Sequence, residues 1–373
     1  MNILKKRTNN GDLVSEIIVK SVIPIFLSLL IFTEGVIDSA IGVIEFSLFF
    51  LNPASRLYIS ETVNDVSYGN SVDMNLSDTE SKETVSSGIV TSIPEDVLQI
   101  MVEAQQTYAD SSNDGKIIEA DYSTQNATSE FNGIYLRNST LNHSVNINDY
   151  MSKRINIKID KTKPTVLIYH THTSETYELL DRGCYTNARS TRSNNEKENM
   201  IRIGKEICET LEKMGYKTIH NTTVYDTEYD GAYERSCAEI SEIIEKNPSI
   251  QIAIDVHRGT IYQKDGTKIK TVTTINGTKA AQILIISGCE DGNVTNFPDW
   301  EKNLTFALNL QKEIVNIYPK LARPIMFCSR KYNMHLLPNA LQVEIGTDGN
   351  TLAEAVFSAR LFALSLAEFL EEY

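Results

Sequence analysis

The stretch VLIYHTHTSETYE, residues 166–178, decides how the chain folds, because an apolar run of strand type ends directly in two histidines. Val, Leu, Ile and Tyr in a short run favour a buried strand. His170 and His172 follow this run, and Glu175 and Glu178 come just behind them. The stretch is therefore either one part of a metal site or a polar loop that is rich in His and Thr.

Three further apolar runs of strand length lie downstream of this stretch, and helical patterns alternate with them. The runs are IQIAIDVH (250–257), AAQILIIS (280–287) and NALQVEIG (339–346). The segment NMIRIGKEICETLEKMG (199–215) repeats apolar residues at steps of three and four, and we expect Gly215 to cap this helix. The alternation predicts an α/β fold with a mostly parallel central sheet flanked by helices.

Titratable side chains stand at or near the ends of these predicted strands. They are His170, His172, His257 and Glu344. In an open α/β sheet the ligand site lies beyond the carboxyl ends of the strands. Two histidines and a carboxylate around an open position form a typical hydrolytic zinc site, and a further carboxylate then takes a proton from water. Because His170 and His172 are two residues apart, we expect only one of them to bind the metal.

The charge balance of the chain excludes one class of partner. Its 49 acidic and 35 basic residues give a net charge of −14, and no basic stripe interrupts the acidic composition. Nucleic-acid binders need such a stripe to neutralise phosphates. We therefore expect no nucleic acid among the partners.

The N-terminal region has the pattern of an uncleaved signal anchor. Lys5, Lys6 and Arg7 precede two apolar runs that together cover residues 21–51. Positive charges on the N-terminal side of an apolar segment favour retention of that side in the cytoplasm. The sequence thus predicts a short cytoplasmic N-terminus over residues 1–20 and a single membrane anchor over 21–51. The rest of the chain, with the catalytic domain, is expected outside the cytoplasm at the cell membrane.

The composition changes after the apolar segment. Residues 52–155 are rich in Ser, Asn, Asp and Thr, which bury too little apolar area to offset the entropy of ordering. We expect a polar stalk with little regular structure, apart from one short helix within SIPEDVLQIMVEAQQ (92–106). Residues 156–373 are then the catalytic domain.

Five stretches of this chain together resemble the stage II sporulation protein P family of endospore-forming bacteria. They are residues 164–177, 199–216, 255–258, 296–314 and 332–355. The match runs in order from about Leu136 to the C-terminus. That family is similar in fold to the zinc-dependent N-acetylmuramoyl-L-alanine amidases.

The resemblance implies a membrane-anchored peptidoglycan hydrolase. Such an enzyme cuts the amide between N-acetylmuramic acid and the first L-Ala of the stem peptide, with endopeptidase activity on peptide cross-links as a second activity. It would degrade septal wall during engulfment of the forespore, in the space between mother cell and forespore. The implied partners are stage II sporulation proteins D and M.

The resemblance also assigns roles to individual residues. His172 and His257 correspond to the histidine ligands of Zn²⁺, and Glu344 corresponds to the catalytic glutamate. Counting back from Gly215 along the helix gives Glu196 as the carboxylate ligand. Two other glutamates stay open for that place, Glu175 and Glu198.

Supporting roles in the second coordination sphere or in substrate binding fall to His170, Glu175 and Arg258. The chain departs from the family pattern His-Arg-Asp at Gly259, which follows His257 and Arg258. Two other functions remain open at this stage. One is a wall-binding scaffold that has lost its activity, and the other is a zinc carboxypeptidase-like enzyme.

Overall fold

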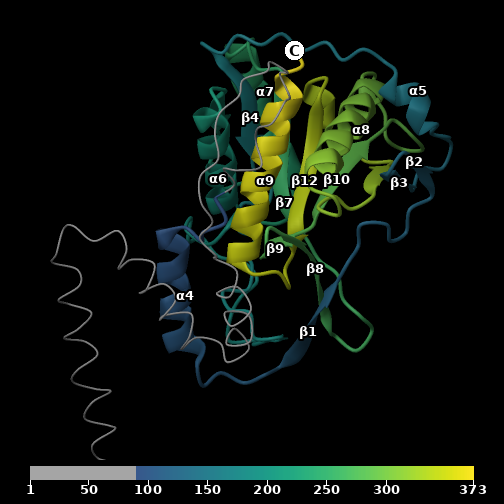
Figure 1. Ribbon diagram of the computed structural model, residues 1–373. Helices are drawn as coiled ribbons and strands as arrows, with labels where there is room; N and C mark the ends of the chain where they lie inside the picture. The colour runs from purple at the N-terminus through teal and green to yellow at the C-terminus, as the bar shows by residue number, and fades with distance from the viewer. Residues whose placement is uncertain (1–89) are drawn as a thin grey trace, which may run out of the picture. The chain divides into compact units, whose positions relative to one another are not determined.

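The computed structural model describes residues 90–373, which form two β-sheets with helices packed around the larger sheet (Figure 1). The helices are α4 (Glu95–Tyr108), α5 (Ile147–Met151), α6 (Met200–Lys213), α7 (Ala232–Lys246), α8 (Trp300–Ile317) and α9 (Leu352–Leu370), with a 3-10 turn η2 (Met334–Leu336). The strands are β1 (Gly115–Ala120), β2 (Ser129–Phe131), β3 (Ile134–Asn138), β4 (Pro164–Tyr169), β5 (Cys184–Tyr185), β6 (Lys217–His220), β7 (Ile252–Gly259), β8 (Lys268–Ile275), β9 (Thr278–Ala281), β10 (Ile283–Gly288), β11 (Ile325–Cys328) and β12 (Ala340–Thr347). The anchor predicted over residues 21–51 lies outside the described residues. Within residues 90–373, no helix has both the length and the apolar composition needed to cross a bilayer.

The larger sheet has eight strands in the order β2-β3-β11-β10-β12-β7-β4-β6. The four predicted strands, β4, β7, β10 and β12, are all present in it, so the predicted α/β class is confirmed. The sheet is mixed, however, and the prediction of a mostly parallel sheet is wrong. Strands β12, β7, β4 and β6 run in one direction, whereas β10, β11 and β3 run in the opposite direction.

The reversal follows from the path of the chain after β7. The chain leaves the large sheet at the end of β7 and forms β8 and β9 in a second sheet of order β5-β1-β8-β9. Only Gln282 separates β9 from β10. The chain therefore re-enters the large sheet at the side where the carboxyl ends of β7 and β12 lie. Because β10 starts there, it runs antiparallel to β12. Figure 1 shows β1 and β8 at this side, below the large sheet.

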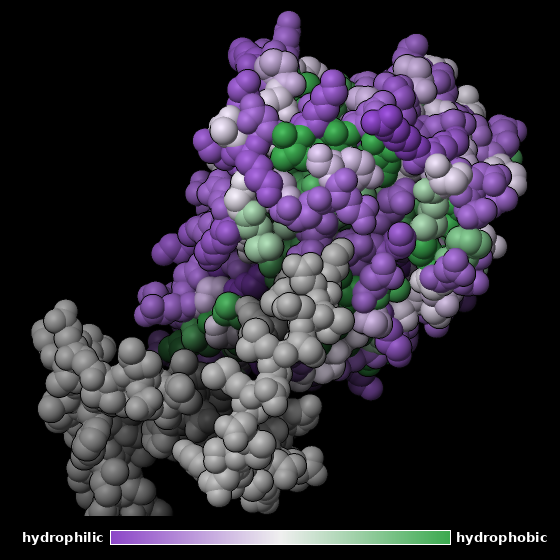
Figure 2. Space-filling model, turned by 45° about the horizontal axis from the view of Figure 1, so that its top comes forward, coloured by the Kyte–Doolittle hydropathy of each residue, from purple (hydrophilic) through white to green (hydrophobic). Residues whose placement is uncertain are grey.

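Alternate residues of the central strands pack into two separate hydrophobic cores. On one face, Ile252, Ile254 and Val256 of β7 pack with the apolar sides of α6, α8 and α9. On the other face, Ala253 of β7 packs with Ile240 of α7. The strand period of two sends successive side chains to opposite faces, and covering helices bury both sets. Figure 2 shows that hydrophilic side chains predominate on the visible coloured surface.

Residues 115–138 of the region predicted as a stalk contribute strands to both sheets, so the folded part of the chain begins before the predicted boundary at 156. Strand β1 pairs with β8, and β3 pairs with β11. Ile117, Ile134 and Leu136 are buried by this pairing. These strands are short and stand among polar residues, and their partners lie far along the chain. Local composition therefore gave no sign of them.

Two local predictions for helices are confirmed. The short helix within the predicted stalk is α4, with Pro94 as its N-cap residue. Gly215 follows the end of α6 with φ +88°, a conformation that glycine adopts without strain.

Candidate active site

The parallel strands β4, β7 and β12 end at the same edge of the large sheet and bring three predicted site residues there. Glu344 of β12 lies in register with His257 of β7. Tyr169, the last residue of β4, lies in register with Asp255, and His172 follows β4 by three residues. Residues from three distant parts of the sequence thus form one cluster.

The two histidines have nitrogens that lack hydrogen-bond partners. The rings of His172 and His257 lie with their centroids 5.4 Å apart and their planes at 86°. His172 Nδ1 and His257 Nε2 are both buried, and neither makes a hydrogen bond. A buried polar atom without a partner costs about 1–3 kcal/mol, so such atoms are rare outside functional sites. His172 Nδ1 thus fits a ligand-binding role, and on His257 it is Nδ1, which lies on the side of Glu175, that is placed for the same role.

Asp255 ties the strand of His257 to the loop of His172. One Asp255 carboxylate oxygen accepts a hydrogen bond from the backbone N–H of Thr171 at 2.9 Å, and the other accepts one from its hydroxyl at 2.6 Å. His257 Nε2 lies 2.8 Å from Asp255 Oδ1, although this contact lacks the direction of a hydrogen bond. Burial lowers the pKa of His257, but Asp255 and Glu175 outweigh it and raise that pKa to about 10. The surroundings of His257 therefore attract positive charge.

Glu175 is the carboxylate that the fold places in this cluster. Its Oε2 lies 3.6 Å from His257 Nδ1 and accepts a hydrogen bond from the backbone N–H of Arg258 at 3.2 Å. Burial raises the pKa of Glu175, but His257, Arg258 and His172 overcome this and hold it at about 2. Glu175 is thus buried and ionised beside the two histidines.

Glu196, the carboxylate ligand expected by counting along the helix, is not brought to the cluster. Its side chain is exposed and makes no hydrogen bond or ion pair within residues 90–373. The helix α6 begins only at Met200, so Glu196 lies in the turn before it. Glu198, the other alternative, pairs with Arg189 at 3.0 Å. A turn closed by the hydrogen bond from Glu175 N–H to His172 O at 3.2 Å places Glu175 at the cluster instead.

His170 and Arg258 support the cluster from behind and do not face it. His170 Nδ1 lies 3.0 Å from Val256 O, and its Nε2 lies 2.9 Å from Nε2 of His220. The Arg258 guanidinium donates to the carbonyls of Thr176 at 2.7 Å and Thr191 at 3.0 Å. The contacts of His170 hold the end of β4 against β7 next to His257. Those of Arg258 hold the loop that carries Glu175.

Glu344 stands beside the cluster with its carboxyl group in a confined space. Burial raises its pKa, Arg323 lowers it, and the negative charge of Glu175 raises it further. A Cβ atom on Gly259 would lie only 2.6 Å from Glu344 Oε2. The glycine that replaces the aspartate of the family pattern thus leaves room for the Glu344 carboxylate.

Aromatic residues that the sequence analysis did not identify line the other side of the cluster. The ring of Tyr229 stacks on that of His172, with centroids 4.6 Å apart and planes at 4°. Tyr233 of α7 meets His172 edge-on at 5.5 Å. Tyr229 keeps 62% of its surface exposed, so it borders the open side of the cluster. Neither tyrosine stands at a strand end, so the reasoning from strand ends did not reach them.

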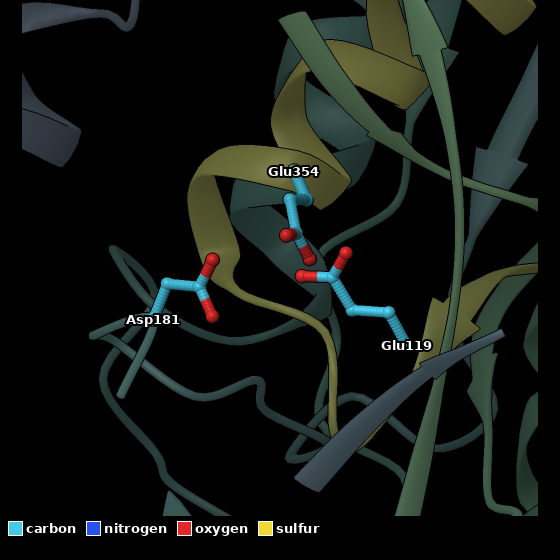
Figure 3. A group of neighbouring side chains, drawn as sticks. All are labelled: Glu119, Asp181 and Glu354. Atoms are coloured by element: carbon cyan, nitrogen blue, oxygen red, sulfur yellow. The ribbon is translucent and has the colours of Figure 1, made fainter. Parts of the chain in front are cut away.

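A second group of acidic side chains lies elsewhere, and Figure 3 shows how its three members converge. The carboxylates of Glu119, Asp181 and Glu354 lie within 4.8 Å of one another. The Lys270 ammonium lies 3.0 Å from Glu119, 2.9 Å from Asp181 and 2.8 Å from Glu354. The lysine already supplies the positive charge that a metal would bring, so this group serves to join β1, β8 and α9.

Comparison with known proteins identifies the family of this chain. Residues 63–367 match the model of the family described as stage II sporulation protein P. The chain belongs to the stage II sporulation protein P family. Stage II sporulation protein P of Bacillus subtilis (strain 168) is 27% identical over 204 residues, which cover 52% of this chain and 47% of that protein. The matched region thus spans about half the length of this curated relative.

Two solved amidase structures have a similar course of the chain, at low similarity. The CwlD amidase from Clostridioides difficile, solved in complex with the GerS lipoprotein, is 14% identical, covers 56% of this chain and 100% of its own, and gives a TM-score of 0.36. The N-acetylmuramoyl-L-alanine amidase AmiC2 of Nostoc punctiforme is 11% identical, covers 56% of this chain and 97% of its own, and gives a TM-score of 0.34. Both TM-scores lie below 0.5.

Proposed function

We propose that this chain is a zinc-dependent N-acetylmuramoyl-L-alanine amidase that hydrolyses peptidoglycan in sporulating cells. The observation that carries the proposal is the cluster of His172, His257 and Glu175, in which two buried imidazoles meet a buried, ionised carboxylate and His172 Nδ1 makes no hydrogen bond. Membership of the stage II sporulation protein P family supports the sporulation setting.

The donor atoms of this cluster fit zinc. Two imidazole nitrogens and one carboxylate oxygen make a common ligand set of catalytic zinc sites, which keep a further position open. His172, His257 and Glu175 would hold the ion, and Asp255 would orient His257. When bound, zinc supplies Lewis acidity, which polarises a carbonyl group and lowers the pKa of a bound water to about 7.

The proton transfers of the reaction fall to Glu344. Its carboxylate accepts a proton from the water whose oxygen adds to the carbonyl carbon of the lactyl group. It then delivers that proton to the amide nitrogen as the C–N bond breaks, which gives a free lactyl carboxylate and a free L-Ala amine. Burial raises the pKa of Glu344, and a carboxyl group with a raised pKa gives up its proton closer to neutral pH.

The proposal is tested with the purified full chain. We expect one bound zinc ion per chain. We also expect release of stem peptides from sacculi, and mass spectrometry should show that they begin with L-Ala carrying a free amino group. Glu344→Gln should keep the zinc and lose turnover. A chain that binds zinc but releases no fragment would instead support an inactive wall-binding scaffold. Cleavage only at the end of the stem peptide would support a carboxypeptidase-like enzyme, and cleaved cross-links would reveal an additional endopeptidase activity.

The choice between Glu175 and Glu196 as zinc ligand has a matched pair of variants. Both Glu175→Gln and Glu196→Gln remove one negative charge from the same type of side chain. We expect Glu175→Gln to lose zinc affinity by at least tenfold, because it removes a direct ligand, and Glu196→Gln to bind zinc like the unmodified chain. Equal affinities in the two variants would rule out Glu175 as the ligand.

The wider setting is also part of the proposal. We propose that residues 21–51 anchor the chain in the cell membrane with the catalytic domain outside the cytoplasm, where septal wall is degraded during engulfment. Stage II sporulation proteins D and M are the proposed partners. Protease added outside intact cells should digest the catalytic domain, and protection of that domain would contradict this orientation. Co-purification from sporulating cells tests the partners.

A further inference from the structure

Arg323, just before β11, carries a guanidinium group that no carboxylate of the described chain neutralises by direct hydrogen bonding. Its Nη1 is buried and has no hydrogen-bond partner. Glu344 Oε2 is 4.0 Å from this nitrogen, which is too far for a hydrogen bond. A guanidinium has five N–H donors, and those of Arg323 make no hydrogen bond within residues 90–373. The described residues therefore leave the hydrogen-bonding capacity of this group unused.

The main chain around Arg323 is fixed, so the position of its side chain is determined by the fold. Its backbone N–H donates to Ile283 O at 2.8 Å, and its carbonyl accepts from Gln311 Nε2 at 2.7 Å. The guanidinium carbon lies 5.6 Å from the centre of the Tyr122 ring, an aromatic wall on one side. A planar guanidinium held in this way can bind a carboxylate through two parallel hydrogen bonds.

A second arginine makes the surroundings of Arg323 more positive. Arg137 of β3 lies in register with Met326 of β11, which packs on the same face of the sheet as Leu284. Arg137 forms no ion pair with any residue in the 90–373 range. Burial lowers the pKa of Arg323, Glu344 opposes this effect, and the positive charge of Arg137 adds to the lowering. In a chain with a net charge of −14, an arginine whose nearest carboxylate is Glu344 at 4.0 Å, together with Arg137, which has no ion pair within residues 90–373, indicates a site for an anion.

The proposed substrate carries a suitable anion near the bond that is cut. In the stem peptide, the second residue is a D-glutamate linked through its side chain, so its α-carboxylate is free. One residue spans about 3.5 Å, so this carboxylate lies one to two residue lengths from the scissile nitrogen. Arg323 Nη1 is 4.0 Å from Glu344 Oε2. With a hydrogen bond of about 3 Å at each end, a carboxylate on Arg323 and the nitrogen that takes the proton from Glu344 can be separated by such a length.

We propose that Arg323 binds the free α-carboxylate of the second stem residue and so makes the site selective for stems with this carboxylate over stems in which it is amidated. The inference rests on the proposed amidase function. A hydrogen-bonded contact with a charged group changes binding by about tenfold to hundredfold when one charge is removed. We expect a preference of this size for the carboxylate form.

The test uses two muropeptides that differ only in the second residue, D-glutamate or D-isoglutamine. The zinc-loaded full chain should cleave the D-glutamate form with a kcat/KM higher by about tenfold to hundredfold, mainly through KM. In Arg323→Gln the ratio between the two substrates should fall to about one, and Arg323→Lys should keep part of it. Lys320→Gln removes a nearby exposed charge and should leave the ratio as it is in the unmodified chain.

Two results would overturn the inference. An unchanged ratio in Arg323→Gln would show that Arg323 does not bind this carboxylate. An equal loss of kcat on both substrates, with the ratio retained, would show that Arg323 only positions Glu344. Circular dichroism and thermal unfolding of each variant confirm that it is folded.

A binding measurement separates this inference from the proposed function. Calorimetric titration of both muropeptides into the Glu344→Gln chain requires no turnover. Tighter binding of the D-glutamate form that disappears in the Glu344→Gln, Arg323→Gln double variant supports the subsite, even if the unmodified chain cleaves nothing. Equal binding of both forms refutes the subsite, even if the amidase activity is confirmed.

Discussion

Replacement of Gly259 by alanine adds a methyl group in the space next to the Glu344 carboxylate. The new Cβ would lie 2.6 Å from Glu344 Oε2 and 3.2 Å from Gly346 O. The carbonyl of Gly346 belongs to the backbone of β12 and cannot easily yield. The carboxylate therefore has to withdraw by about 0.8 Å to restore an ordinary contact of 3.4 Å.

The size of the effect follows from this displacement. A shift of about 1 Å in a catalytic group costs up to about a hundredfold in rate. We expect Gly259→Ala to lower kcat by about tenfold to hundredfold, which is about 1.4–2.7 kcal/mol of transition-state stabilisation. Crowding in the packed strand also costs about 1–3 kcal/mol of folding stability. Zinc content should stay the same, because Gly259 supplies no ligand.

The assay measures kcat on a soluble muropeptide, zinc by metal analysis and stability by urea unfolding. Gly349→Ala is the matched control, since a Cβ there meets its nearest neighbours at 3.4 Å. This variant should keep kcat within about twofold of the unmodified enzyme. A Gly259→Ala enzyme with full kcat and intact zinc would refute the assignment of Glu344 as the group that moves the proton.

Three further predictions concern the stability of the chain. Lys270→Met leaves the buried carboxylate of Glu354 without its cation, whereas Glu119 and Asp181 keep Lys279, so the free energy of unfolding in urea should fall by about 3 kcal/mol; a fall below about 1 kcal/mol would contradict this role. Burial lowers the pKa of His220 from 6.5 to about 4, so below pH 6.5 the unfolded chain binds a proton that the folded chain does not. The stability from neutral His220 is full above pH 6.5, and about 3 kcal/mol is lost as the pH falls to 4. His220→Asn should show a smaller loss over the same range, and an unchanged slope would refute the argument. Chelation of zinc should lower the stability by about 3 kcal/mol relative to a sample with zinc at a hundredfold excess over Kd, and an unchanged Tm would argue against a bound metal.

The sequence predicted the parts of the fold that follow from local patterns. Strands β4, β7, β10 and β12 are continuous apolar runs, and α6 has a clear helical period that ends at Gly215. The direction of β10 depends on where the chain re-enters the sheet after β8 and β9, which no local pattern records. The strands β1 and β3 become stable only through pairing with β8 and β11, which lie far along the chain. Their own composition is polar, so the sequence predicted a stalk there.

The candidate site shows the same division. Strand ends pointed to His172, His257 and Glu344, because the carboxyl ends of parallel strands converge. The third carboxylate depended on how a loop turns, and counting along a helix gave Glu196 when the turn between His172 and Glu175 was the decisive feature. Asp255 could have been found from its spacing of two residues before His257 on the same strand, which places both side chains on one face.

The pairing of β3 with β11 joins two segments that the ribosome synthesises at different times. Strand β3 leaves the ribosome early, whereas its partner is made only when most of the chain has been synthesised. Until then β3 has an open edge, and long-range pairing of this kind slows folding and exposes strands to aggregation. A chain cut short after β10 therefore lacks both the partner of β3 and the segment that carries Arg323 and Glu344. Such a fragment would be a substrate for quality control rather than a weak enzyme.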